Sequence, residues 1–141
     1  MRQNYIVDTG PLVALLNSRD QYHPWARDLF ESIEPPLATC EAVISEACFL
    51  VRGMKGGAHA VFGLLDRGVL DLSFRLEPHL TAVEALMSRY SSLPMSLADA
   101  CLVKMSELDP KAVILTFDSD FRVYRRNGRQ VVPVAMPDRL G

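Results

Sequence analysis

The sequence lacks the features that mark a membrane protein or a disulfide-stabilised one. No apolar run approaches the roughly 20 residues that a membrane-spanning helix requires. The three cysteines are an odd number and no two have CxxC spacing, which argues against a disulfide framework and against a zinc site. The first residues run directly into an apolar segment and leave no room for a signal peptide, so we expect a protein of the reducing cytoplasm.

An excess of charge of either sign is also missing. The 15 basic and 17 acidic residues leave a formal net charge of −2, whereas nucleic-acid-binding domains are usually basic. Any polyanion must therefore be bound locally. The chain has one basic cluster near its C-terminus, Arg122, Arg125, Arg126 and Arg129, which is equally compatible with an ordinary solvated surface.

What the chain does have is a regular alternation of strand and helix patterns. Its 141 residues, 49% of them hydrophobic, suit a single core without linkers or repeats. The predicted strands are 4–7, 37–39, 69–74, 112–116 and 131–135. The predicted helices are 11–16, 24–33, 41–52, 58–66, 78–90 and 96–108. Strands separated by helices imply a mainly parallel sheet with helices on both faces, a three-layer α/β/α sandwich.

Two acidic residues follow closely on predicted strands. Asp8 comes directly after Tyr5-Ile6-Val7, and Asp118 comes just after Ile114-Leu115-Thr116-Phe117. Parallel α/β sheets bind ligands beyond the carboxyl ends of their strands, so both acids are expected at the functional edge. Each acid taken alone also fits a turn or a helix cap.

Two further acids occur on predicted helices among apolar neighbours. The side chains three and four positions from Glu46 are all apolar: Ala42, Val43, Phe49 and Leu50. We therefore expect Glu46 to face the core or a cleft. Asp99 lies in the first turn of helix 96–108 on its inward face, where a capping box with Ser96 and the helix dipole offer a purely structural alternative.

A shared divalent cation accounts for all four acids at once. Ionised carboxylates in apolar surroundings are unfavourable unless they are paired or bound to a metal. Carboxylate oxygens are the ligands that Mg²⁺ and Mn²⁺ prefer. The histidines lie in three different segments and are interpreted as ordinary surface or core residues: His23, His59 and His79.

Four short segments carry these acids in order along the chain. They are Ile6-Val7-Asp8-Thr9-Gly10-Pro11-Leu12, Ile44-Ser45-Glu46, Leu97-Ala98-Asp99-Ala100 and Leu115-Thr116-Phe117-Asp118-Ser119-Asp120-Phe121. Together they resemble the PIN-domain family, most closely the VapC-type toxins, over nearly the whole chain. The resemblance implies one PIN-like nuclease domain over residues 1–141, with a sheet of about five parallel strands. It also implies a metal-dependent endoribonuclease that hydrolyses RNA phosphodiester bonds, as the toxin of a toxin–antitoxin pair.

The resemblance assigns roles to individual residues. Asp8, Glu46 and Asp99 match three acidic, metal-binding positions of the family. Asp118 and Asp120 both fit the fourth position, and Asp118 is favoured because it lies nearer the strand end. Thr116 matches a hydroxyl position that orients the metal site, and Thr9 is a candidate for the same task.

The expected chemistry is hydrolysis assisted by one or two Mg²⁺ or Mn²⁺ ions that bind the scissile phosphate and acidify a water molecule. Glu46 is the candidate acceptor of the water's proton. The arginine cluster is expected to hold the RNA backbone without reading bases. The expected partners are RNA, a small antitoxin protein that covers the acidic pocket, and a second copy of the chain in a homodimer, with no membrane involved.

Three other functions stay open on the sequence alone. Val7-Asp8-Thr9-Gly10 is also a signature of pepsin-like aspartic proteases, although their paired aspartates require an all-β fold and a second such motif. A phosphotransferase would use Asp8 as its nucleophile, but Gly10 stands where its second aspartate is usual. A PIN-fold module that binds RNA or a partner without cleavage would keep the same acids.

Overall fold

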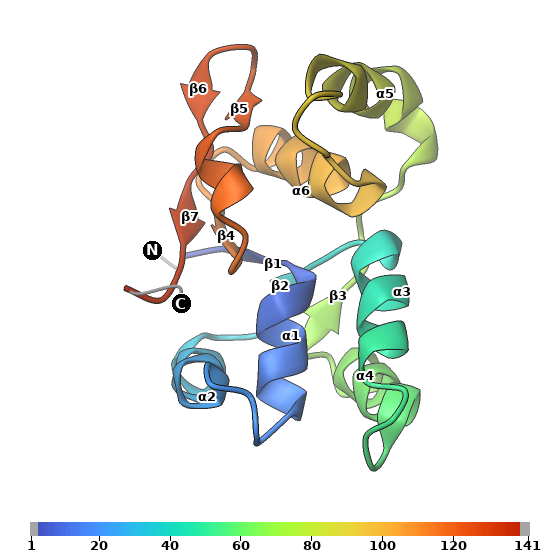
Figure 1. Ribbon diagram of the computed structural model, residues 1–141, viewed down its shortest axis with the longest axis vertical. Helices are drawn as coiled ribbons and strands as arrows, with labels where there is room; N and C mark the ends of the chain where they lie inside the picture. The colour runs from blue at the N-terminus through green and yellow to red at the C-terminus, as the bar shows by residue number, and fades with distance from the viewer. Residues whose placement is uncertain (1–2, 139–141) are drawn as a thin grey trace.

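The computed structural model describes residues 3–138 and places a five-stranded sheet between two layers of helices (Figure 1). The strand order is β3-β2-β1-β4-β7, and every strand pairs in parallel with its neighbours. Figure 1 shows α5 and α6 above the sheet and α1, α2 and α4 below it, while α3 contacts both α1 and α6. The three-layer architecture expected from the sequence is confirmed.

The strands of this sheet are short. Their bounds are β1 (Tyr5–Val7), β2 (Leu37–Ala38), β3 (Leu70–Asp71), β4 (Val113–Leu115) and β7 (Val134–Ala135). The central strands β1 and β4 carry Ile6, Val7, Ile114 and Leu115, which are 0 to 2% exposed. Such strands are apolar on both faces because helices cover both sides of a parallel sheet.

All six predicted helices are present, with small changes at their ends. Their bounds are α1 (Thr9–Leu16), α2 (His23–Ser32), α3 (Glu41–Leu50), α4 (Gly57–Asp66), α5 (Leu80–Arg89) and α6 (Leu97–Leu108). A 3₁₀ turn, η1 (Glu77–His79), precedes α5 where one continuous helix was expected. None of the helices in residues 3–138 has the length and apolar character needed to cross a membrane.

The prediction of one strand over residues 131–135 is wrong. The segment divides into β6 (Gln130–Val131), which pairs antiparallel with β5 (Arg125–Arg126), and β7, which joins the main sheet. Pro133 lies between β6 and β7, where it has no N–H to donate but its carbonyl accepts from the Ile114 amide at 2.9 Å. The turn between β5 and β6 uses positive φ angles at Asn127 and Gly128, as the Asn-Gly pair suggests.

Candidate active site

Asp8 lies where β1 ends and α1 begins, at the carboxyl edge of the sheet. Its amide donates to the Leu115 carbonyl at 2.9 Å, and its Oδ1 caps α1 by accepting from the Thr9 amide at 2.7 Å. The residue is only 8% exposed. Burial raises the pKa of Asp8 to about 6, and the charges of Asp99 and Asp118 add to this, although two hydrogen bonds oppose it. Asp8 is therefore a buried acid held rigidly at a strand end.

Thr116 connects Asp8 to Asp118. Its hydroxyl donates to Asp8 Oδ2 at 2.7 Å and accepts from the Asp118 amide at 3.0 Å. The side chain is completely buried. Because one hydroxyl makes both contacts, it sets the relative position of the two acidic segments.

Asp118 interacts electrostatically with Asp8 and with Asp99. Its negative charge contributes to the raised pKa values of Asp8 and Asp99. Its Oδ1 accepts from the Asp120 amide at 2.9 Å and caps a 3₁₀ turn, η2 (Ser119–Arg122). Partial burial, followed by the charge of Asp118, raises the pKa of Asp120 as well. Asp120 thus adjoins the acidic group through Asp118.

Asp99 combines both interpretations that its sequence position allowed. Its amide donates to Ser96 Oγ at 3.0 Å and the Ser96 amide donates to Asp99 Oδ2 at 3.4 Å, which completes the capping box. Burial is the main reason that its pKa is raised, with the charge of Asp118 contributing. The Ser96 amide and the Tyr124 hydroxyl both donate to the same carboxylate oxygen, Asp99 Oδ2. Asp99 therefore caps α6 and carries a charge that interacts with that of Asp118.

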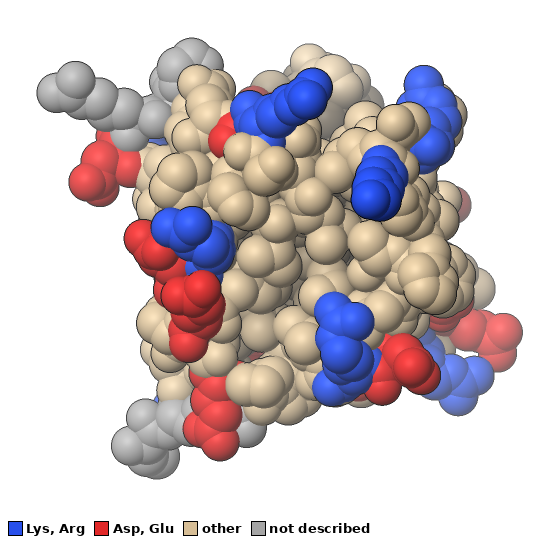
Figure 2. Space-filling view, turned by 90° about the horizontal axis from the view of Figure 1, so that it is seen from below, with Lys and Arg blue, Asp and Glu red and all other residues tan. Residues whose placement is uncertain are grey.

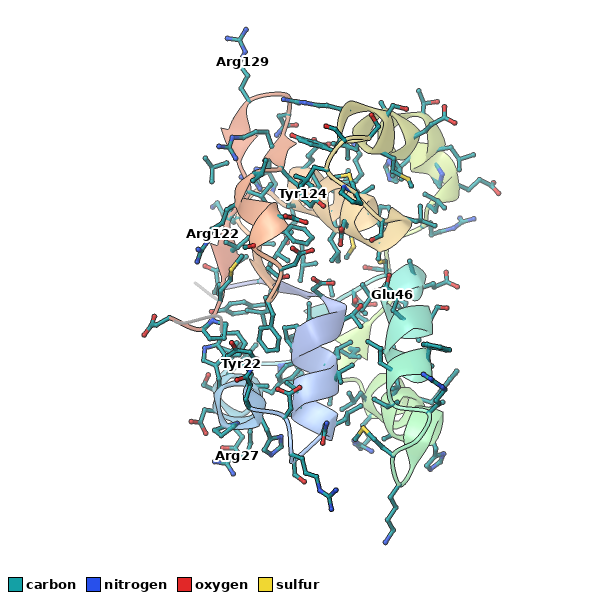
Figure 3. The ribbon with its side chains drawn as sticks, in the orientation of Figure 1. Tyr22, Arg27, Glu46, Arg122, Tyr124 and Arg129 are labelled. Carbon is teal, nitrogen blue, oxygen red and sulfur yellow. The ribbon has the colours of Figure 1, made fainter. Side chains whose placement is uncertain are left out.

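Glu46 is exposed on α3, so of the core and the cleft that its sequence position allowed, the structure supports the cleft. Its neighbours Phe49 and Leu50 are themselves 62% and 55% exposed, because this side of α3 is a surface. Glu46 instead borders a hollow of about 550 Å³ between α3 and the start of α6. Its Oε2 accepts from the Thr9 hydroxyl at 2.9 Å, which holds it opposite the start of α1 (Figure 3).

Tyr124 belongs to the same group although no sequence motif marks it. It is completely buried, and its hydroxyl donates to Asp99 Oδ2 at 3.1 Å. Its ring packs edge-on against Tyr90 and Phe121, with centroid distances of 5.1 and 5.2 Å. Burial and the Asp99 charge raise the pKa of Tyr124, so the phenol stays protonated and remains a donor. The one signal in the sequence is that Tyr124 follows Phe121 by three residues, a spacing that allows the two rings to pack together.

The four C-terminal arginines do not form the single basic surface that was expected. Arg126 is 8% exposed, and its guanidinium donates to the carbonyls of Ser106 at 2.7 Å and Pro110 at 3.0 Å. It therefore supports the end of α6 and is inaccessible to RNA. The physical reason is that β5 alternates its side chains, so Arg126 turns inward while Arg125 does not.

The other three arginines have separate surroundings. Arg125 folds back on its own segment and donates to the carbonyl of Arg122 at 2.7 Å. Arg129 is exposed at the tip of the β5–β6 hairpin and points away from the molecule (Figure 3). Arg122, exposed in η2, is the one closest in sequence to Asp118. The face seen from the side of α2 and α4 likewise has charges of both signs around an uncharged, hollowed centre (Figure 2).

No basic side chain among residues 3–138 forms an ion pair with these acids. The ion pairs within residues 3–138 are Arg27–Asp28 and Lys104–Glu107, and neither involves Asp8, Asp99 or Asp118. No group of three or more His, Cys, Asp or Glu side chains in this range is arranged so that all of them could hold one metal ion. Mg²⁺ commonly takes only one or two protein carboxylates and completes its shell with water and phosphate oxygens. Buried, mutually repelling carboxylates without a cationic partner fit such a partial site.

Comparisons with known proteins identify the fold and the family. Residues 5–127 match the family model of the PIN domain. The structure resembles the crystal structure of Mycobacterium tuberculosis VapC20, a toxin that cleaves the sarcin–ricin loop, with a TM-score of 0.73 and 24% identity over 85% of this chain and 94% of that one. The curated proteins include no match. Because the family model covers most of the chain, including every acid described above, this chain belongs to the PIN-domain family.

Proposed function

We propose that this chain is a metal-dependent endoribonuclease that hydrolyses RNA phosphodiester bonds, as the toxin of a toxin–antitoxin pair. The observation that carries the proposal is the gathering of Asp8, Asp99 and Asp118 at the carboxyl edge of the sheet, where none of residues 3–138 forms an ion pair with them. Ribonucleases of the VapC type generally use divalent metal ions. The fold shared with VapC20, which cleaves the sarcin–ricin loop, supports RNA as the substrate.

The chemistry follows from what each side chain is able to do. A divalent cation bound among Asp8, Asp99 and Asp118, directly by one or two of them, would neutralise phosphate charge and lower the pKa of a water molecule. Thr116 keeps Asp8 and the Asp118 backbone in register. Glu46, held by the Thr9 hydroxyl, accepts the proton of the attacking water. The exposed Arg122 contacts the RNA backbone, which positions the substrate without reading bases.

The proposal is tested by cleavage assays on single-stranded RNA and on a sarcin–ricin loop oligonucleotide during a Mn²⁺ titration. Asp99→Asn keeps a side-chain oxygen for the capping box, so we expect stability within about 1 kcal/mol of wild type. It loses one carboxylate charge, so we expect cleavage to fall at least tenfold. Asp71→Asn, which changes an acid outside the site on β3, is the matched control and should cleave normally.

Two results would count against the proposal. Cleavage that persists in EDTA would remove the metal from the mechanism. Binding of RNA without cleavage by the wild type would favour the alternative, a PIN-fold module that binds RNA or a partner.

A comparison of Asp118→Asn with Asp120→Asn tests which of the two acids occupies the fourth acidic position of the family. We expect Asp118→Asn to cause the larger loss of cleavage, because the charge of Asp118 acts on both Asp8 and Asp99. An equal or larger loss in Asp120→Asn would assign the position to Asp120.

The proposal includes protein partners. A small antitoxin would cover the acidic site, and a second copy of this chain would form a homodimer. The exposed apolar side chains of α3 and α4, Phe49, Leu50 and Phe62 at 55 to 62% exposure, support self-association. Sedimentation of the purified chain at micromolar concentration tests this, since a monomer would contradict the homodimer.

The free cysteines Cys40, Cys48 and Cys101 suit the reducing cytoplasm in which we place the protein.

A further inference from the structure

Three aromatic rings form a cluster beside the acidic residues. The Phe117 ring lies 4.7 Å from the Tyr22 ring and 5.5 Å from the Trp25 ring, centroid to centroid, with tilts of 46° and 60°. All three side chains are partly exposed. We call Tyr22, Trp25 and Phe117 the aromatic platform.

The aromatic platform lies outside the hydrophobic core of residues 3–138. The core and the side chains packed against it include Leu29, Phe30 and Ile33 from α2 and the following residue, but none of the three platform residues. The helix and the residue after it thus contact the core through Leu29, Phe30 and Ile33, while Tyr22 and Trp25 contact Phe117 outside the core. The contacts of Tyr22 and Trp25 with Phe117 leave part of each ring exposed to solvent.

The platform is held next to the acids by backbone geometry. Phe117 directly precedes Asp118, and consecutive Cα atoms are about 3.8 Å apart. On its other side the ring packs against Gly10, where an added Cβ would lie 2.9 Å from Phe117 Cδ2. Gly10 is in the first turn of α1, which Asp8 caps. The ring therefore sits between the Asp8 and Asp118 segments and faces α2.

The surroundings of the platform suit a single-stranded nucleic acid. Figure 3 shows Arg122, Tyr22 and Arg27 in this order down the same side of the molecule. Arg27 is 54% exposed, and Arg122 is also exposed, so each is able to contact a phosphate. Base stacking on aromatic rings contributes about 1–3 kcal/mol per base and tolerates any sequence. A base presented to such a ring must first be unstacked, as in RNA loops and single strands.

We propose that Tyr22, Trp25 and Phe117 form a stacking subsite for one unpaired nucleobase of the RNA, next to the phosphate that is cleaved. The proposal rests on the proposed ribonuclease function and goes beyond it by requiring an unpaired base on one side of the cleavage position. The acidic residues act on the phosphate, and the platform selects RNA in which the adjacent base is free to leave its stack.

Binding is tested with the fluorescence of Trp25, the only tryptophan of the chain. The wild-type protein is titrated with short single-stranded RNA in Ca²⁺, and separately with the same sequence as a blunt duplex. We expect single-stranded RNA to quench Trp25 emission at saturation and the duplex to leave it nearly unchanged. Emission that does not respond to bound RNA, as judged by anisotropy of labelled RNA, would overturn the proposal.

Cleavage is tested with paired substrates in Mn²⁺. After the wild-type cleavage position is mapped, kcat/KM is compared for intact RNA and for RNA that lacks the base on either side of that position. We expect one of the two base-free RNAs to be cleaved roughly 5- to 150-fold less efficiently by wild type. Tyr22→Leu and Trp25→Leu should cleave intact RNA less efficiently and lose most of this discrimination. Phe30→Leu, on the same helix but packed against the core, should keep it.

These experiments distinguish a failure of the stacking subsite from a failure of the ribonuclease proposal. Cleavage by wild type without discrimination at either position overturns the subsite and leaves the nuclease standing. Quenching by single-stranded RNA without any cleavage supports the subsite as an RNA contact and rejects the nuclease. If Trp25 emission shifts with protein concentration in the absence of RNA, the platform binds a second copy of the chain, which also overturns the proposal. The Trp25 quenching and the cleavage of base-free RNA by wild type need no variant, so both still test the proposal if Tyr22→Leu fails to fold.

Discussion

At the scale of single residues, the burial of Asp8 makes its charged form less favourable than it would be in water. Its pKa is raised from 3.8 to about 6, so the folded state holds this proton more tightly than the unfolded state does. By linkage, the contribution of Asp8 to stability is most favourable below pH 4 and is lost as the pH rises through 6. A shift of this size corresponds to roughly 3 kcal/mol at most.

Asp8→Asn should therefore stabilise the metal-free fold at neutral pH. The amide carries no charge and keeps an oxygen that accepts from Thr116 or Thr9. In EDTA, the melting temperature of the variant should exceed that of wild type at pH 7.5, and the difference should shrink towards pH 4. Thermal melts of both proteins across this range check the sign. A variant that is less stable at every pH would show that the lost hydrogen bond outweighs the relieved charge.

Tyr124 should act on the site through Asp99 alone. Tyr124→Phe keeps the packing against Tyr90 and Phe121 but removes the hydrogen bond to Asp99 Oδ2. We expect a loss of about 1 kcal/mol in stability and a roughly tenfold higher Mn²⁺ concentration for half-maximal cleavage, with kcat nearly restored at saturating Mn²⁺. Tyr90→Phe, which alters the hydroxyl that accepts from the Arg125 amide, is the control. An unchanged Mn²⁺ requirement would make Tyr124 a purely structural residue.

At the scale of secondary-structure elements, the β5–β6 hairpin is tied to α6 by Arg126. The guanidinium bonds to two carbonyls at the end of α6, while its Nε is buried without a hydrogen-bond partner among the described residues. The side chain thus satisfies the Ser106 carbonyl in the last turn of α6, which would otherwise lack a donor, and the Pro110 carbonyl just beyond the helix. The basic segment of the sequence is in part a structural clamp.

Arg126→Ala should destabilise the protein by roughly 2–3 kcal/mol, because charged hydrogen bonds and buried packing are lost together. Cleavage per folded molecule should stay close to wild type. Arg129→Ala, on the exposed hairpin tip, should leave stability unchanged. Urea melts combined with initial cleavage rates separate the two effects. Reduced RNA binding by a fully folded Arg126→Ala protein would restore the original expectation of a four-arginine surface.

At the scale of the whole molecule, the site without a cation contains like charges that weaken the fold. A cation that binds only the native state stabilises it by about 1.4 kcal/mol at ten times its dissociation constant. For a domain of this size that corresponds to a rise of roughly 3–6 °C in melting temperature. We expect millimolar Mn²⁺ to produce such a rise in wild type and a smaller one in Asp99→Asn. A melting curve that Mn²⁺ leaves unchanged would argue against the metal site.

The sequence by itself determined the architecture and the candidate acids. Hydrophobic periodicity is local, so residues 11–16 and 96–108 could be recognised as helices and residues 112–116 as a buried strand without any knowledge of their neighbours. The carboxyl ends of parallel strands lie at one edge of the sheet, so the sequence alone predicted that Asp8 and Asp118 lie at the same edge. The division at Pro133 was missed because the apolar run 131–135 looks continuous until pairing partners are known.

Only the tertiary structure decided which way each side chain faces and what it contacts. The apolar neighbours of Glu46 allowed the core or a cleft, and only the packing shows that Phe49 and Leu50 are exposed and that Glu46 borders a hollow. Arg122 and Arg126 look alike in the sequence, yet one is exposed and the other buried. The contact from Tyr124 to Asp99 joins residues 25 positions apart. Such contacts depend on how the layers pack, and packing is a property of the whole chain that no local pattern encodes.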